Sequence, residues 1–111
     1  MALTPEARQT FARLFGAEPE PHPTDPELYE ILQNQIFGEV FATGVLTDSE
    51  RELLTVTVLA AIQTLPQLAA HVKAALNVGV APLEVREAIY QCAPYIGYPK
   101  ALNAAATANE V

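Results

Sequence analysis

The sequence predicts an all-α protein, a compact bundle of about six helices. Prolines and glycines punctuate the junctions between apolar-periodic segments, in positions typical of helix starts and ends. No segment shows the alternating apolar and polar residues that indicate a strand. A length of 111 residues favours one domain over 1–111, in which residues 1–24 form an N-terminal helix and a proline-rich connector.

The first helix is predicted to follow Thr4, which is a good N-cap residue, and to begin at Pro5. Its apolar stripe comprises Ala7, Phe11, Leu14 and Phe15. Gly16 can end it. Residues 17–24 contain three prolines, which indicates an extended connector and makes His22 a solvated loop residue.

A long second helix is predicted from about residue 26 to residue 42. One apolar face carries Leu28, Ile31, Leu32 and Ile36, and another carries Tyr29, Phe37 and Phe41. Two apolar faces favour burial on two sides, one of which can face another subunit. Glu39 follows Ile36 by three positions and therefore projects from the apolar stripe. A carboxylate in such a place tends to be neutralised, paired or used.

The third helix is predicted to start at Thr47 or Asp48 and to be apolar nearly all round over 53–62, which makes it the central buried helix. The short stretch 44–46 before it is too short for a linker, so no domain boundary is expected there. Pro66 opens a fourth helix that ends near Gly79.

Pro82 opens a fifth helix, for which the predicted inner stripe is Val85, Ala88, Ile89 and Cys92. Pro94 and Gly97 are expected to interrupt the chain, and Pro99 opens a last, alanine-rich helix.

Composition narrows the function classes. Thirteen acidic against six basic residues, with no basic cluster, argue against nucleic acid or an anionic membrane as a partner. No apolar run reaches membrane-spanning length and no secretory signal is visible, so we expect a cytoplasmic protein. Half of the residues are apolar, more than a chain of this size easily buries, which favours a homo-oligomer.

Few side chains are candidates for catalysis or for binding a metal or cofactor. No histidine pair, cysteine set or glycine-rich loop with the spacing of a metal or cofactor site occurs, so we expect neither. Cys92 lies on an apolar helical stripe, where a buried, inert thiol is the simpler interpretation. His71 borders the apolar face of the fourth helix and is either a structural histidine or a functional one.

Several stretches together resemble the carboxymuconolactone decarboxylase family: FGEVF at 37–41, REL at 51–53, LPQLAAHVKAALNVGV at 65–80, EVREAIYQCAPYIGYPKALNA at 84–104 and the closing ANEV. The resemblance covers roughly residues 26–111. It implies the alkylhydroperoxidase D-like all-α fold, assembled as a trimer or a trimer-based hexamer, with sites near subunit interfaces.

The same superfamily includes proteins with a C-x-x-C-x-x-H motif that carries disulfide chemistry. Leu65 and Leu68 correspond to the two cysteines and His71 to the histidine. Leucine forms neither a thiolate nor a disulfide, so thiol peroxidase or disulfide reductase activity is not expected.

The resemblance implies a cofactor-independent lyase that acts on a small carboxylated lactone or related organic acid. In this hypothesis Arg51 clamps a substrate carboxylate, His71 is the hydrogen-bond donor or acid, and Glu39 carries the proton or orients His71. Glu52 is an alternative to Glu39, and Tyr95 can add a hydroxyl. The competing hypothesis is a non-catalytic oligomeric scaffold or small-molecule-binding protein of the same fold.

Overall fold

The computed structural model describes residues 2–111, which are helical throughout apart from short connections and contain no strand. The elements in order are α1 (Pro5–Phe15), α2 (Pro26–Gln33), η1 (Asn34–Val40), η2 (Phe41–Thr43), α3 (Asp48–Ile62), α4 (Leu65–Asn77), α5 (Pro82–Ile96) and α6 (Tyr98–Asn109). The all-α prediction is confirmed. Within this described part of the chain, no helix has both the length and the apolar character needed to cross a membrane.

The chain divides into two compact units, an N-terminal unit that ends at Thr47 and a C-terminal unit that comprises residues 48–111. The division follows the short stretch 44–46, where the sequence analysis expected no boundary because no linker is present. A single folding domain over 1–111 stays a prediction.

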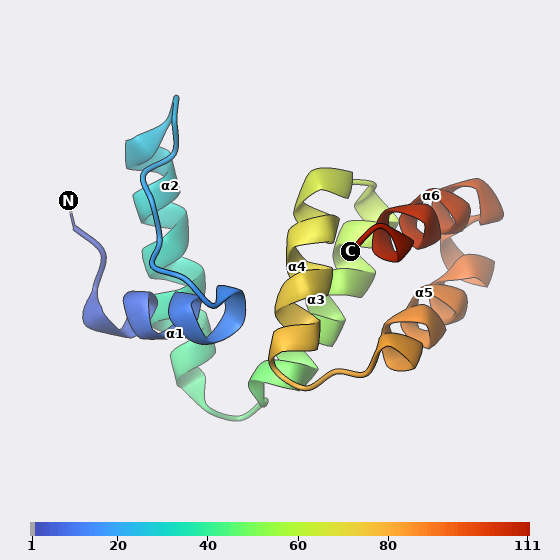
Figure 1. Cartoon of the computed structure of the whole chain (residues 1–111), viewed down its shortest axis with the longest axis horizontal. Helices are drawn as coiled ribbons and strands as arrows, with labels where there is room; N and C mark the ends of the chain where they lie inside the picture. The colour runs from blue at the N-terminus through green and yellow to red at the C-terminus, as the bar shows by residue number, and fades with distance from the viewer. Residues whose placement is uncertain (1) are drawn as a thin grey trace. The chain divides into compact units, whose positions relative to one another are not determined.

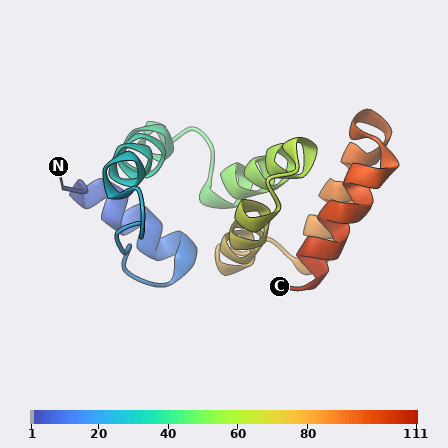
Figure 2. The ribbon, with the colours of Figure 1, turned by 90° about the horizontal axis from the view of Figure 1, so that it is seen from above.

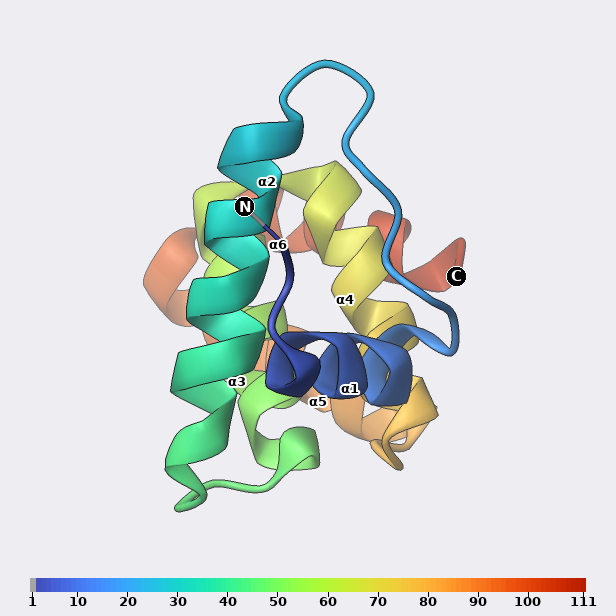
Figure 3. The same ribbon diagram turned by 90° about the vertical axis from the view of Figure 1, so that its left-hand side faces the viewer.

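In the N-terminal unit, α1 runs crosswise to the helical segment 26–43 and packs on η1 (Figure 3). The Thr4 side chain accepts a hydrogen bond from the Ala7 backbone N–H, and Gly16 ends α1 in the left-handed conformation, as predicted. Aromatic rings fill this contact: the ring centroids of Phe11 and Phe37 are 6.0 Å apart and those of Phe37 and Phe41 are 5.5 Å apart.

The segment 26–43 is continuous but is not a uniform α-helix, which corrects the prediction. Its hydrogen bonding widens to a π-helix over η1 and tightens to a 3₁₀ turn over η2. The buried face carries Gln33, Phe37 and Phe41, whereas Leu28, Ile31 and Leu32 are exposed. Gly38 packs closely on α1, since a Cβ there would lie 3.0 Å from Thr4 Oγ1. Packing against α1 thus sets the buried face, and one of the two predicted apolar faces is left open in the single chain.

In the C-terminal unit, α3 packs on α4 and α5, and α5 and α6 lie side by side (Figures 1 and 2). The core is built from Val56, Ala60, Leu68, Val72, Ala75, Val80, Val85, Ile89 and Ala104. The expectation that α3 is buried all round is wrong for the single chain, because Leu54, Val58 and Ile62 are exposed along one face.

Two details of α5 also differ from prediction. The helix continues through Pro94 to Ile96, because a proline near the end of a helix removes few hydrogen bonds, and the Gly97 N–H still bonds to the Ala93 carbonyl. The inner stripe is Val85, Ile89 and Ala93, so Cys92 is half-buried at its edge.

Candidate functional site

A histidine and a glutamate meet inside the C-terminal unit. His71 Nδ1 on α4 lies 2.8 Å from Glu52 Oε1 on α3. The two helices are adjacent, and the short 63–64 connection returns α4 along α3, so residues 19 positions apart face each other. This distance is that of a charge-assisted hydrogen bond.

The glutamate is fully buried, with 0% of its side chain exposed, whereas 20% of the His71 side chain is exposed. Glu52 Oε2 has no hydrogen-bond partner among the described residues. Removing a carboxylate from water is costly, and one hydrogen bond offsets only part of that cost. Glu52 therefore contributes little to stability that an apolar side chain could not supply, which favours a functional reason for its presence.

The surroundings of the pair are apolar and finely packed. Leu68 is completely buried in the core, and the partly buried Leu65 packs against that core. Alanines at positions 69, 70, 74 and 75 leave little side-chain bulk on α4. The Glu52 carboxyl group is shielded from water, which strengthens its electrostatic interaction with the partly exposed His71.

The other predicted site residues are placed as follows. Arg51 precedes Glu52 on α3 and is half-buried. Glu39 lies in η1 of the N-terminal unit and is exposed. Tyr95 is 82% exposed near the C-terminal end of α5. Among the predicted candidates, the structure joins His71 to Glu52, the glutamate that the sequence analysis named as the alternative to Glu39.

Glu52, predicted only as an alternative to Glu39, is the fully buried glutamate of the two. A usable signal was present in the sequence, because the apolar residues Val56 and Ala60 follow Glu52 at four and eight positions and therefore share its helical face. A carboxylate in line with such residues must itself be buried. Within residues 2–111, no group of three or more His, Cys, Asp or Glu side chains is arranged to hold a metal ion.

The sequence of the chain is similar to those of known proteins. The sequence model of the carboxymuconolactone decarboxylase family matches residues 26–110. Over 75 residues the chain is 32% identical to a nitrosuccinic acid decarboxylase from Metarhizium robertsii, a match that covers 68% of this chain and 52% of the relative. Over 75 residues it is 36% identical to a 4-carboxymuconolactone decarboxylase from Acinetobacter baylyi, which covers 68% and 56%. The chain therefore spans about half the length of the curated relatives it matches.

Proposed function

Because the chain belongs to the carboxymuconolactone decarboxylase family, we propose that it is a lyase that removes CO2 from a small organic acid. The observation that carries this proposal is the hydrogen bond between His71 and the fully buried Glu52. A buried carboxylate that holds an imidazole in place is the arrangement that positions a proton for transfer.

The substrate class follows from the chemistry that the two named relatives share. One acts on a carboxylated lactone and the other on a nitro acid, by their names. A conjugated lactone and a nitro group can each accept the electron pair that remains when CO2 leaves. We therefore assign to this chain a small carboxylic acid with a built-in electron acceptor, and such a substrate needs no cofactor as an electron sink.

The proposed proton transfer uses both members of the pair. Glu52, as a carboxylate, accepts a hydrogen bond from Nδ1–H of a doubly protonated His71. The C–C bond to the carboxylate breaks, CO2 leaves, and the electron pair moves onto the acceptor group of the substrate. His71 Nε2 then gives its proton to a carbon over which that electron pair is delocalised, and water restores the proton on His71 after the product leaves.

Arg51, Glu39 and Tyr95 complete the proposal. Arg51 is assigned to a second carboxylate of the substrate, because a guanidinium binds a carboxylate through two parallel hydrogen bonds. Glu39 and Tyr95 are both exposed in the single chain, so we assign them to surfaces that a partner subunit covers. A homo-oligomer with sites near its interfaces would bring such residues to a site.

The test measures CO2 release from 4-carboxymuconolactone and from nitrosuccinate. We expect turnover of at least one of them, and His71→Ala should lower it by about 10²–10⁴-fold, the scale of a positioned acid or base. The matched control is His22→Ala, which removes the other histidine from the proline-rich connector and should leave turnover unchanged.

Arg51→Ala should raise KM more than it lowers kcat, if the carboxylate that it binds does not react. No turnover of either acid by the parent protein, together with loss of the assembly in His71→Ala, would instead support the non-catalytic scaffold.

A further inference from the structure

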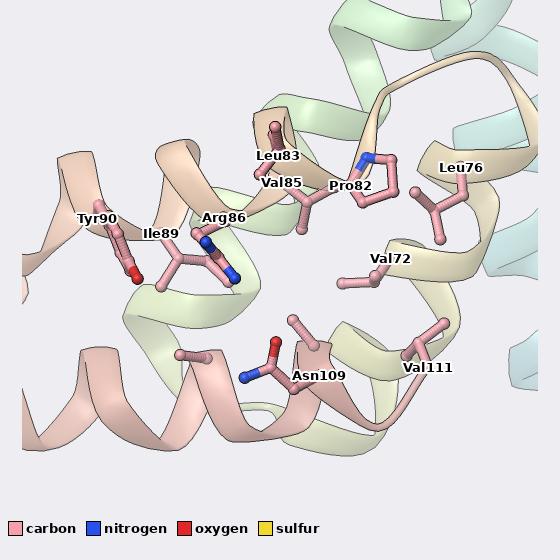
Figure 4. Close-up of a pocket in the computed structure, with 12 residues that line it drawn as sticks. Val72, Leu76, Pro82, Leu83, Val85, Arg86, Ile89, Tyr90, Asn109 and Val111 are labelled. Carbon is pink, nitrogen blue, oxygen red and sulfur yellow. The ribbon is translucent and has the colours of Figure 1, made fainter.

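A cavity lies in the C-terminal unit, away from the His71–Glu52 pair. It has a volume of about 280 Å³ and lies among α4, α5 and α6 (Figure 4). Its lining consists of Val72, Leu76, Pro82, Leu83, Val85, Arg86, Ile89, Tyr90, Ala105, Ala108, Asn109 and Val111. Neither His71 nor Glu52 belongs to that lining. Val72 follows His71 directly, and successive residues of a helix point about 100° apart, so the two features occupy different sides of α4.

The floor of the cavity is apolar, and three polar side chains, Arg86, Tyr90 and Asn109, belong to its lining. Val72, Val85 and Ile89 belong to the buried core beneath it. Figure 4 shows Arg86 from α5 and Asn109 from α6 reaching into the same space, with the Tyr90 hydroxyl directed toward α6. An apolar body with a few convergent polar groups is the usual composition of a small-molecule site, and the volume lies near the lower end of the roughly 300–1,000 Å³ typical of such sites.

The charged side chain in the lining of the cavity is that of Arg86. The protein carries a formal net charge of −7, yet the cavity is lined by an arginine and by no aspartate or glutamate. Within residues 2–111, Arg86 has no ion-pair partner. Its guanidinium is therefore available to an anion from outside the chain, and the Asn109 amide and Tyr90 hydroxyl can add hydrogen bonds to the same anion.

We propose that this cavity is a binding site for a small amphipathic carboxylate, whose anionic end pairs with Arg86 and whose apolar body covers Val72, Val85 and Ile89. The proposal does not depend on the proposed decarboxylase function, because the two sites share no residue. The size of the cavity restricts the ligand to a short acyl chain or a single ring.

The probe is octanoate, compared with octanol, which has the same apolar chain and no charge. Titration calorimetry on the full chain should show saturable octanoate binding and much weaker octanol binding. Arg86→Gln should weaken octanoate binding about tenfold, because it removes the charge-assisted hydrogen bonds. The matched control is Lys73→Gln, which removes the same charge from an exposed position of α4 outside the lining and should leave binding unchanged.

Two further variants test whether octanoate binds in this cavity. Leu83→Glu places a carboxylate at the exposed edge of the cavity and should abolish octanoate binding without disturbing the core. His71→Gln should not change it. Three results would overturn the inference: no saturable binding, equal binding of octanol, or binding that His71→Gln abolishes and Arg86→Gln leaves intact. Binding that His71→Gln abolishes would place octanoate at the His71–Glu52 pair. The absence of saturable binding would be expected if a second copy of the chain fills the cavity.

Discussion

The two units of the chain are packed with different types of apolar side chain. All four phenylalanines lie in the N-terminal unit, where three of them, Phe11, Phe15 and Phe37, form mutual ring contacts between α1 and η1. The C-terminal unit contains no phenylalanine, and its core consists of alanine, valine, leucine and isoleucine. Small side chains let helices approach closely, and this is the unit in which side chains of α3 and α4 form a direct polar pair.

Each unit also contains a buried polar side chain that is incompletely bonded. Gln33 in the N-terminal unit and Glu52 in the C-terminal unit both have a side-chain oxygen without a hydrogen-bond partner within the described residues. The amide is neutral and its burial costs little compared with that of a carboxylate. The hydrogen bond to His71 offsets part of the cost of burying Glu52. The buried polar group of the first unit is thus neutral, whereas that of the second unit is a carboxyl group hydrogen-bonded to an imidazole.

The largest expected effect tests whether the charge of Glu52 matters or only its shape. Glu52→Gln keeps the size of the side chain and an oxygen that can accept from His71 Nδ1–H, but it removes the negative charge. We expect the melting temperature to change little and turnover to fall at least 100-fold, because a neutral amide stabilises a protonated imidazole poorly. Turnover equal to that of the parent would reduce Glu52 to a positioning residue that orients the ring.

The sequence was informative where local chemistry determines the structure. Thr4, Pro5 and Gly16 define the ends of α1, and Pro82 starts α5, because caps and prolines act within one helical turn. The border position of His71 on an apolar helical face left a structural and a functional role open, and the resemblance to the family favoured the functional one.

The features that the sequence did not predict depend on tertiary contacts. The π-helix of η1 and the burial of Gln33 arise from packing against α1, which periodicity along one segment does not report. The pairing of His71 with Glu52 needs the register of α4 against α3, and no spacing within either helix contains that information.

A second prediction concerns the apolar faces that both units leave exposed. Leu28, Ile31 and Leu32 are exposed in the N-terminal unit, and Leu54, Val58 and Ile62 in the C-terminal unit. Such faces favour association, so light scattering should give a mass several times 12.0 kDa, with six times expected. Ile31→Glu and Val58→Glu show which unit carries the contact, because the variant that introduces a charge into the interface lowers the mass.

Gln67→Glu, which adds the same charge at an exposed position of α4, is the control for both variants and should keep the parent mass. A monomeric parent protein at micromolar concentration would contradict this prediction and would leave Glu39 and Tyr95 without the partner surface proposed for them.

A third prediction concerns a variant that places a buried carboxylate in the N-terminal unit, as Glu52 does in the C-terminal unit. Gln33→Glu places a carboxylate in the N-terminal unit at a buried position beside the phenylalanine-rich contact. We expect the free energy of unfolding to fall by about 3 kcal/mol at pH 7, the scale of an uncompensated buried charge. The loss should shrink toward pH 4, because burial favours the protonated carboxyl and protonation removes the charge. Denaturant unfolding of the parent and the variant at the two pH values measures this loss. A free energy of unfolding equal to that of the parent would mean that a cation reaches this position.

The smallest expected effect concerns Cys92, a titratable group of the C-terminal unit that has no charged partner to stabilise its ionised form in the described contacts. Burial raises the pKa of the Cys92 thiol above its ordinary value of 9.0. The fraction of reactive thiolate at a given pH is therefore smaller than that of a free thiol, and the alkylation rate should reach half its maximum at a higher pH. At pH 8 we expect iodoacetamide to modify Cys92 a few-fold more slowly than it modifies glutathione, as followed by mass spectrometry.

Cys92→Ser should leave turnover and the melting temperature unchanged, because the thiol lies at the edge of the inner stripe of α5 and has no part in the proposed proton transfer. Alkylation faster than that of glutathione, or loss of turnover in a folded Cys92→Ser variant, would show that the C-terminal unit contains a second reactive group besides the His71–Glu52 pair.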